Sequence, residues 1–418
     1  MKTLPRNPEL LRAAALTARV LPGLREPDRG AGGHDDYFAG LQAALKLAGV
    51  AQPTLVIDRR RLEANVAIVR EALVGAGLAL RLVTKSLPAP DLLAAVLAAT
   101  GATRLMVFNG VMLEEMVRFR PGVDILTGRP LPAAQVADFL SRHGASPVPA
   151  AHPAWLADSP TRLAQYAEIG RANRAVLRIN LEIDVGLHRG GLRGLPALAE
   201  ALALIEADPW LRFDGLMGYD AQVVAARQPQ AEADRVRARF AAAVGLVRGT
   251  LGDRAGLTFD IGGSATYALH LGDKAANEVA VGSAFVKPAH FDLPTLSAHQ
   301  PAAFIAEPVL KVVDPALYPG REDLTSAINR LDPNSARGFF LYGGYDDARV
   351  VSPAGLRFSA LYGGRAMLAG SRRVALAQDD FVFLRPTQSE GVFLRFGDIA
   401  VYDGQTICAW WPTFPIHA

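Results

Sequence analysis

The chain has 418 residues, a length that fits two domains or a large barrel with a smaller partner rather than one small domain. Hydrophobic residues make up 50% of the sequence and charged residues 20%, a composition that excludes an intrinsically disordered chain. The formal net charge is only +3 and no run of five or six like charges occurs, so no nucleic-acid partner is expected.

The sequence carries none of the usual signals for a membrane or for secretion. Residues 1–24 lack the continuous apolar stretch of a secretory signal. No window supplies the roughly 20 uninterrupted apolar residues of a membrane helix. The single cysteine, Cys408, excludes an internal disulfide and a metal cluster held by cysteines alone. We therefore expect a cytoplasmic protein without a membrane partner.

The first 50 residues predict an N-terminal helical extension. Residues 36–47 carry apolar side chains at helical spacing. The sequence Pro8-Glu9-Leu10-Leu11 indicates the start of an earlier helix. The glycine-rich residues 29–35 predict a loop between the two.

Short apolar runs alternate with Ala/Leu-rich helical segments over residues 51–295. The predicted strands are residues 54–58, 79–85, 104–109, 123–127, 146–151, 175–183, 213–219, 257–261 and 278–286. Such alternation indicates βαβ units with parallel strands. Their number exceeds the roughly five or six strands of a doubly wound sheet. The sequence therefore predicts an α/β fold with a (β/α)8 barrel of the TIM type in this range.

Residues 296–418 follow a different pattern. Short alternating runs replace the helical segments, and Gly-Gly, Asp-Asp and Asp-Gly turns separate them. Alternation at period two with such turns is typical of antiparallel sheets. We expect a C-terminal all-β domain over this range.

Lys85 is the candidate catalytic nucleophile, because polar residues at the carboxyl ends of barrel strands form the face where such barrels keep their active sites. The residues at these ends are Lys85, Asn109, Asp184, Tyr219 and Gly262-Gly263. A lysine at a barrel mouth is partly desolvated, which lowers the pKa of its amine and favours Schiff-base formation. The alternative is a structural lysine paired with an acidic side chain at the strand end.

Two glycine–serine segments occur near the last predicted strands, the first after the strand at residues 257–261 and the second within the run at residues 278–286. The first contains Gly262, Gly263, Ser264 and Thr266, and the second is Gly282-Ser283. Glycines allow backbone N–H groups to approach an anion, and late loops of such barrels commonly bind phosphate. Plain turns are the alternative. A lysine at an early strand together with a phosphate site at late strands predicts pyridoxal 5′-phosphate as the cofactor.

Motifs spread over residues 54–286 resemble those of fold-type III, alanine racemase-like pyridoxal-phosphate enzymes. The resemblance is closer to the branch that contains D-threonine aldolases and D-serine dehydratases. The motifs are TLVID, LEANV, LRLVTK, EIDVGLHRGG, GLMGY and the two glycine–serine segments. The resemblance supports a cofactor-binding set of Lys85, Arg189, Tyr219, Gly262, Gly263, Ser264, Thr266, Gly282 and Ser283.

The resemblance also implies individual roles. Lys85 carries the cofactor, Arg189 lies against its ring, and Tyr219 lies near the pyridine ring. Whether Arg189 meets the ring nitrogen or the ring hydroxyl stays open. His188 lies inside the same motif and is a candidate catalytic base. A strand-end histidine bonded to backbone is the alternative for His188.

Metal-dependent members of that branch bind a divalent ion near their C-terminus. The resemblance places Thr406 on the histidine ligand and Cys408 on the second ligand, and the earlier segment Gln388-Ser389-Glu390 has no histidine. Threonine is a poor substitute for imidazole in a zinc or manganese site. We therefore predict that the usual metal site is absent.

The resemblance implies an enzyme that acts at Cα or Cβ of a small D-amino acid, as a lyase like D-threonine aldolase or D-serine dehydratase but without the usual metal. The alternative within this class is a metal-independent amino-acid racemase. The alternative from another class is a non-catalytic pyridoxal-phosphate-binding protein. Single-domain proteins of that kind lack a β domain, which counts against this alternative.

The resemblance implies, finally, a homodimer with shared active sites. In alanine racemase-like enzymes a tyrosine of the β domain can reach the active site of the partner as a second acid/base group. Tyr342 and Tyr345 lie in the sequence LYGGYDD of the predicted β domain. Of these, Tyr345 is the predicted catalytic residue.

Overall fold

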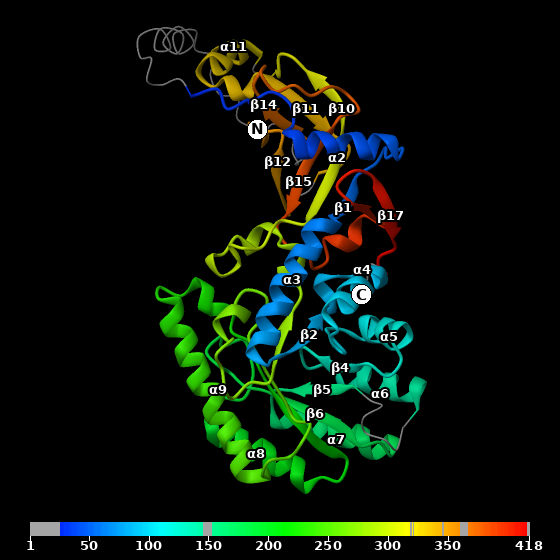
Figure 1. Ribbon diagram of the computed structural model, residues 1–418, viewed down its shortest axis with the longest axis vertical. Helices are drawn as coiled ribbons and strands as arrows, with labels where there is room; N and C mark the ends of the chain where they lie inside the picture. The colour runs from blue at the N-terminus through cyan, green and yellow to red at the C-terminus, as the bar shows by residue number, and fades with distance from the viewer. Residues whose placement is uncertain are drawn as a thin grey trace. The chain divides into compact units, whose positions relative to one another are not determined.

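The computed structural model describes residues 26–144, 153–317, 320, 322–344, 347–359 and 367–415 (Figure 1). The chain divides into two compact units. A barrel unit is formed by Arg60–Ala302, Gln388–Gly397 and the described part of Trp411–Ala418. A β unit is formed by the described parts of Met1–Arg59, Ala303–Thr387 and Asp398–Trp410. Within the described ranges, no helix has the length and apolar character needed to cross a membrane.

Eight parallel strands close the barrel in chain order, and neighbouring strands pair in parallel register. The strands are β2 (Ala79–Val83), β3 (Arg104–Val107), β4 (Asp124–Thr127), β5 (Ala154–Ala157), β6 (Leu177–Glu182), β7 (Leu211–Gly218), β8 (Thr258–Ile261) and β9 (Glu278–Val281). The predicted TIM-type barrel is therefore confirmed. The predicted strand at residues 146–151 lies outside the described residues, and the strand β5 begins after it.

Helices alternate with these strands along the chain (Figure 1). They are α3 (Arg59–Ala76), α4 (Pro90–Thr100), α5 (Gly110–Phe119), α6 (Ala133–His143), α7 (Pro160–Asn173), α8 (Gly194–Ala207), α9 (Pro229–Leu251) and the short α10 (Ser283–Val286). Their ends follow from local sequence. Ser159 caps α7 by accepting the N–H of Arg162, and Pro160 stands in its first turn, where no N–H is needed. Gly101 ends α4 in the left-handed conformation, with φ of 69°.

The β unit is built on a nine-stranded, mostly antiparallel sheet. Its strands are β1 (Thr54–Asp58), β10 (Ala303–Val313), β11 (Arg337–Leu341), β12 (Ala348–Ser352), β13 (Arg357–Phe358), β14 (Met367–Gly370), β15 (Phe381–Pro386), β16 (Ile399–Tyr402) and β17 (Ile407–Trp411). The helices α2 (Asp36–Leu47) and α11 (Glu322–Leu331) belong to the same unit. The predicted β domain in the C-terminal part of the chain is confirmed.

One strand was assigned to the wrong sheet. Residues 54–58 were predicted as a barrel strand, but β1 pairs antiparallel with β10 and parallel with β16 in the β unit. All five residues of β1 are buried, and a continuous apolar run looks the same in a parallel barrel and in the middle of a mixed sheet. As a result, the described part of the predicted N-terminal extension belongs to the β unit. The helix expected at Pro8–Leu11 lies outside the described residues.

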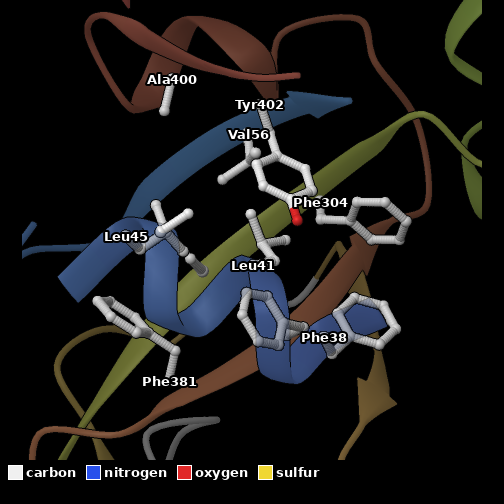
Figure 2. Close-up of a cluster of buried hydrophobic side chains, with 11 residues drawn as sticks. Phe38, Leu41, Leu45, Val56, Phe304, Phe381, Ala400 and Tyr402 are labelled. Carbon is white, nitrogen blue, oxygen red and sulfur yellow. The ribbon is translucent and has the colours of Figure 1, made fainter. Parts of the chain in front are cut away.

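An aromatic core joins α2 to the sheet of the β unit. Figure 2 shows Phe38, Leu41 and Leu45 extending from α2 toward the strands. The sheet contributes Val56 from β1, Phe304 from β10, Phe381 from β15 and Ala400 and Tyr402 from β16. The helix begins at Asp36 because the Asp35 side chain accepts the N–H of Phe38. The resulting core holds the helix α2 against the sheet.

Candidate active site

A cavity lies at the carboxyl ends of the barrel strands. Its empty volume is roughly 580 Å³, a figure that includes space open to solvent. All of its lining residues belong to the barrel unit. They come from β2, β3, β7, β8 and β9, from the loops that follow strands of the barrel, and from the segment Gln388–Gly397.

Lys85 stands at one wall of this cavity. The strand β2 ends at Val83, and Lys85 lies in the short 3-10 helix η2 (Thr84–Ser86). Its Nζ is 2.8 Å from Oε1 of Glu390 and 4.1 Å from the centre of the Phe108 ring. The sequence left open a lysine paired with an acidic side chain, and the structure shows such a pair. Because both partners line the cavity, the pair also places an amine and a carboxylate at a candidate reaction site.

Arg189 and Tyr219 form another part of the wall. The guanidinium carbon of Arg189 lies 4.9 Å from the centre of the Tyr219 ring, a cation–π distance. Its Nη2 is 3.6 Å from Oε1 of Glu182. Burial raises the pKa of the Tyr219 phenol, and the positive charge of Arg189 opposes this change. Tyr219 is therefore a neutral hydrogen-bonding and stacking group at neutral pH.

His188 lies outside the cavity although it precedes Arg189 in the chain. Its Nδ1 is 2.8 Å from Oδ2 of Asp184, and its side chain is 71% exposed. The backbone of His188 has a positive φ of 56°, which turns consecutive side chains in different directions. Burial disfavours the ionised form of Asp184, but hydrogen bonds from His188 and Gly186 outweigh it and lower the pKa of Asp184. This placement gives no support to the predicted role of His188 as a base.

The glycines of the two predicted phosphate segments stand where a larger residue does not fit. A Cβ on Gly263 would lie 2.7 Å from Cε2 of Tyr219. A Cβ on Gly282 would lie 2.8 Å from the Cβ atoms of Val83 and Ser86. Gly262 has a positive φ of 82°, which glycine adopts without strain. Gly262 and Gly263 line the cavity, whereas Gly282 packs against Val83 and Ser86 and is not among the described residues that line it.

Two serines of these segments line the cavity and tie the segments to their surroundings. The Oγ of Ser264 accepts the N–H of Gly282 at 2.9 Å, which joins the two segments. The Oγ of Ser283 lies 3.0 Å from that of Ser86 and 3.4 Å from that of Ser389. These contacts give a chain of hydroxyl groups beside the glycine turns.

Thr266 stabilises the first glycine–serine segment through hydrogen bonds of its hydroxyl group. It is buried and is not among the described residues that line the cavity. Its Oγ1 accepts the N–H of Gly263 at 3.1 Å and donates to Oδ1 of Asp220 at 2.5 Å. The other oxygen of Asp220 lies 2.7 Å from Nε2 of His270, and both of these side chains are fully buried. Thr266 therefore fixes the turn rather than lining the cavity itself.

Several residues at this site were missed by sequence reasoning. Glu390 comes from the segment Gln388–Gly397, far along the chain, and no local pattern indicates that this segment returns to the barrel unit. Phe108, from the loop after β3, lines the cavity beside Lys85. Asp260 also lines the cavity. Its position directly before the Ile-Gly-Gly turn is the one signal that could have found it.

The residues predicted for the C-terminal part of the site are placed as follows. Tyr345 lies outside the described residues, and Tyr342 is an exposed side chain of the β unit. The Oγ1 of Thr406 lies 3.4 Å from Oδ2 of Asp403, and the Sγ of Cys408 lies 3.5 Å from the carbonyl oxygen of Val401. In the described part of the chain, no three His, Cys, Asp or Glu side chains are grouped so as to hold a metal ion. The residues present therefore do not fit the metal site of the branch, and metal independence stays a prediction.

Comparisons with known proteins bear on the fold and the family. Residues 57–289, more than half of the chain, match the family model described as alanine racemase, N-terminal domain. A search of curated protein sequences gave no significant match. The fold is similar to several solved structures. A D-threonine aldolase from Filomicrobium marinum shares 18% identity with a TM-score of 0.70, over 88% of this chain and 96% of that chain.

Two further solved structures have the same fold. The D-threo-3-hydroxyaspartate dehydratase from Delftia sp. HT23 shares 18% identity with a TM-score of 0.66, over 88% of this chain and 99% of that chain. The alanine racemase from Bacillus anthracis shares 14% identity with a TM-score of 0.60, over 80% of this chain and 85% of that chain. At these identities the likeness establishes the shared fold.

Proposed function

Because the chain belongs to the family of the alanine racemase N-terminal domain, we propose that its barrel cavity binds pyridoxal 5′-phosphate and that the enzyme cleaves or dehydrates a small β-hydroxy D-amino acid. The predicted kinship with fold-type III enzymes of the alanine racemase kind is confirmed by this membership. The chain is accordingly an enzyme of that kind, a lyase or a racemase. The proposal concerns which of these reactions it performs.

The residues around the cavity fit the proposed cofactor. Gly262 and Gly263 line the cavity with their backbone, and a Cβ on Gly263 would clash with Tyr219. Ser264 and Ser283 supply hydroxyls to the same cavity. Backbone N–H groups and hydroxyls of this kind suit a phosphate. The amine of Lys85 suits an aldehyde. Arg189 and Tyr219 together offer a cation and an aromatic face for a flat ring.

The observation that carries the proposal is the contact of 2.8 Å between Lys85 Nζ and Glu390 Oε1. A substrate carbon bound at this wall meets an amine and a carboxylate side by side. The amine of Lys85 is suited to moving a proton at Cα, and the carboxylate of Glu390 is suited to moving one at the β-hydroxyl. A β-hydroxy amino acid carries both of these positions on adjacent carbons.

The chemistry that pyridoxal 5′-phosphate supplies when bound is a sink for the electron pair released at Cα. In an aldol cleavage, Glu390 accepts the proton of the β-hydroxyl as the Cα–Cβ bond breaks, and Lys85 returns a proton to Cα. In a dehydration, Lys85 removes the proton from Cα and Glu390 donates a proton to the departing hydroxyl. In either case Glu390 performs at the hydroxyl the role for which related enzymes of the branch use a metal ion.

The same contact favours a lyase over a racemase. Groups that touch each other serve one side of a bound substrate, whereas a racemase delivers and removes protons on the two opposite faces of Cα. An amino-acid racemase is the second candidate function, with Tyr345 of a partner subunit as the opposing group. The third candidate is a protein that binds the cofactor without catalysing a reaction, and the assay must distinguish it from the two enzymes.

The test is a screen of D- and L-amino acids, with and without a β-hydroxyl group, that measures carbonyl products and the optical purity of the remaining substrate. We expect carbonyl products from D-β-hydroxy amino acids alone. Glu390→Gln is expected to lower turnover at least about a hundredfold while the bound cofactor is retained. Glu200→Gln, on the exposed face of α8, is the matched control.

Racemisation without carbonyl products would replace the lyase by the racemase. Cofactor binding without turnover of any amino acid would leave only the binding function. A Glu390→Gln enzyme with full lyase activity would remove the proposed role of this carboxylate while leaving the reaction assignment intact.

A further inference from the structure

Asp260 is a buried acid at the floor of the cavity that the proposed reaction does not use. It lies in β8 and is only 1% exposed, yet it is one of the residues that line the cavity. Its carboxyl group receives a hydrogen bond from the backbone of Ala280. Its Oδ1 has no hydrogen-bond partner among the described residues. A buried polar atom without a partner is costly and calls for an explanation.

The cavity floor around Asp260 is apolar. Val83, Met106, Met217 and Ala280 line the same cavity, and all four belong to one buried cluster inside the barrel. None of these side chains can donate a hydrogen bond to a carboxyl oxygen. The free oxygen of Asp260 is therefore a polar atom beside four apolar side chains of the cavity wall.

The charges deeper in the barrel do not serve as partners for Asp260, because they are already engaged with one another. Glu278 pairs with Arg81 and Arg104, and Asp124 pairs with Arg81 and Arg178. Asp260 receives no ion pair from this network. Burial, and next the negative charge of Glu278, raise the pKa of Asp260 well above its usual range, while Arg81 and Arg104 oppose the shift.

We propose that the free oxygen of Asp260 binds the ring nitrogen of pyridoxal 5′-phosphate. The inference rests on the proposed function, since it takes the cavity to be the cofactor site. A pyridine nitrogen is a basic acceptor within a flat apolar ring, so it matches a carboxylic acid set in an apolar floor. The other polar groups of the cofactor are accounted for by the glycine–serine turns, by Lys85, and by Arg189 and Tyr219.

The proton balance follows from the two partners. A hydrogen bond between the two needs one proton, which the raised pKa of Asp260 favours on its carboxyl group, and one lone pair, which the ring nitrogen supplies. One hydrogen bond therefore forms, and the proton lies on the carboxyl or on the nitrogen. When it lies on the nitrogen, the carboxylate and the ring form a buried ion pair, which strengthens the hold on the cofactor and the capacity of the ring to accept electrons.

The first experiment uses the wild-type protein and two probes. One is pyridoxal 5′-phosphate, and the other is 1-deazapyridoxal 5′-phosphate, in which a CH group replaces the ring nitrogen. We expect the protein without cofactor to bind the first roughly ten- to a hundredfold more tightly, as one charge-assisted hydrogen bond in a buried site allows. Equal affinity for the two probes would overturn the proposal without any variant.

The second experiment uses Asp260→Asn. We expect this substitution to reduce the preference between the probes, because an amide N–H donates a weaker hydrogen bond to the ring nitrogen than a carboxylic acid or an ion pair provides. We also expect it to shift the ¹⁵N resonance of ring-labelled cofactor toward that of an unprotonated pyridine. The urea midpoint of the variant without cofactor should be no lower than that of wild type, because the substitution removes an acid whose ionised form is disfavoured by burial. A residue with a merely structural role would lower the midpoint and leave the resonance unchanged.

Asp58→Asn is the matched control, because Asp58 is a buried acid of the β unit that accepts a hydrogen bond of 2.7 Å from Tyr37. It should lower the urea midpoint and leave the probe preference unchanged. If wild type binds neither probe, the proposed function itself fails. If wild type binds pyridoxal 5′-phosphate at Lys85 but Asp260→Asn shows the full wild-type probe preference and an unchanged resonance, only the role of Asp260 is wrong.

Discussion

Replacing Gly263 with alanine would place a methyl group 2.7 Å from Cε2 of Tyr219. Ordinary contacts of such a carbon begin at 3.4 Å, so the overlap is about 0.7 Å. The backbone of Gly263 does not have a positive φ, and alanine therefore meets no conformational penalty there. The effect of this substitution is the displacement of the Tyr219 ring.

The loss of stability caused by Gly263→Ala depends on how tightly the Tyr219 ring is packed. Tyr219 is partly buried, and the guanidinium of Arg189 lies against its face at 4.9 Å. Overpacking of this kind costs about 1–3 kcal/mol. We expect the free energy of unfolding to fall by an amount in this range. A similar loss of binding free energy for the cofactor corresponds to a dissociation constant that is larger by roughly 5- to 150-fold.

The assay combines urea denaturation of the protein without cofactor and titration with pyridoxal 5′-phosphate. Gly245→Ala is the matched control, because Gly245 lies within α9 and a Cβ there would meet no atom within 4 Å. This control should be stabilised by up to about 1 kcal/mol, since alanine is the better helix former. It should bind the cofactor like wild type.

A double-mutant cycle isolates the clash. In a Tyr219→Val background the ring is absent, so Gly263→Ala should cost less than about 0.5 kcal/mol in stability. The reasoning is refuted if Gly263→Ala behaves like Gly245→Ala in both assays. It is also refuted if the cost of Gly263→Ala stays the same in the Tyr219→Val background, because the strain would then lie elsewhere.

Three further predictions concern the cofactor, the metal and the subunit arrangement. Borohydride reduction of the yellow protein followed by peptide mapping should place the pyridoxyl group on Lys85, and a label on another lysine would contradict the site. Turnover should survive chelation, because neither Thr406 nor Cys408 belongs to a grouped set of metal ligands within the described residues; loss of activity that manganese or zinc restores would contradict this. The protein should be a homodimer with shared active sites. Where Tyr345 serves the site of the partner, as in the racemase alternative, mixing inactive Lys85→Ala subunits with subunits inactivated by changes at Tyr342 and Tyr345 should restore up to about a quarter of the activity per site. A monomer in sedimentation, or no recovery despite proven subunit exchange, would count against shared sites.

The barrel could be predicted because its signal is local. Each βα unit shows its own switch from a short apolar run to a helical pattern, and the caps at Ser159 and Gly101 are fixed by neighbouring residues. The carboxyl ends of parallel barrel strands meet on one face by geometry. Lys85, Tyr219 and the Gly262-Gly263 turn therefore come together once the strand ends are known, and all of them line the cavity.

Other features of the site depend on the direction in which side chains point rather than on where the residues lie in the sequence. His188 and Arg189 are adjacent, but the positive φ of His188 leaves its ring in solvent beside Asp184 while Arg189 reaches the cavity. Thr266 lies in the predicted phosphate segment, yet its hydroxyl is bound to Asp220 behind the turn. Sequence spacing located both residues correctly along the chain and could not specify where their side chains point.

The sequence by itself determined the barrel, the lysine at the end of its first strand and the glycine turns at its last strands, since these follow from short-range periodicity and backbone freedom. Only the tertiary structure decided that β1 joins β10 and β16 and that Glu390 contacts Lys85. It also decided that Asp260 lines the cavity, with an Oδ1 that has no hydrogen-bond partner among the described residues. Each of these depends on contacts between segments far apart in the chain. Burial and pairing are properties of the folded surroundings, and no local pattern carries them.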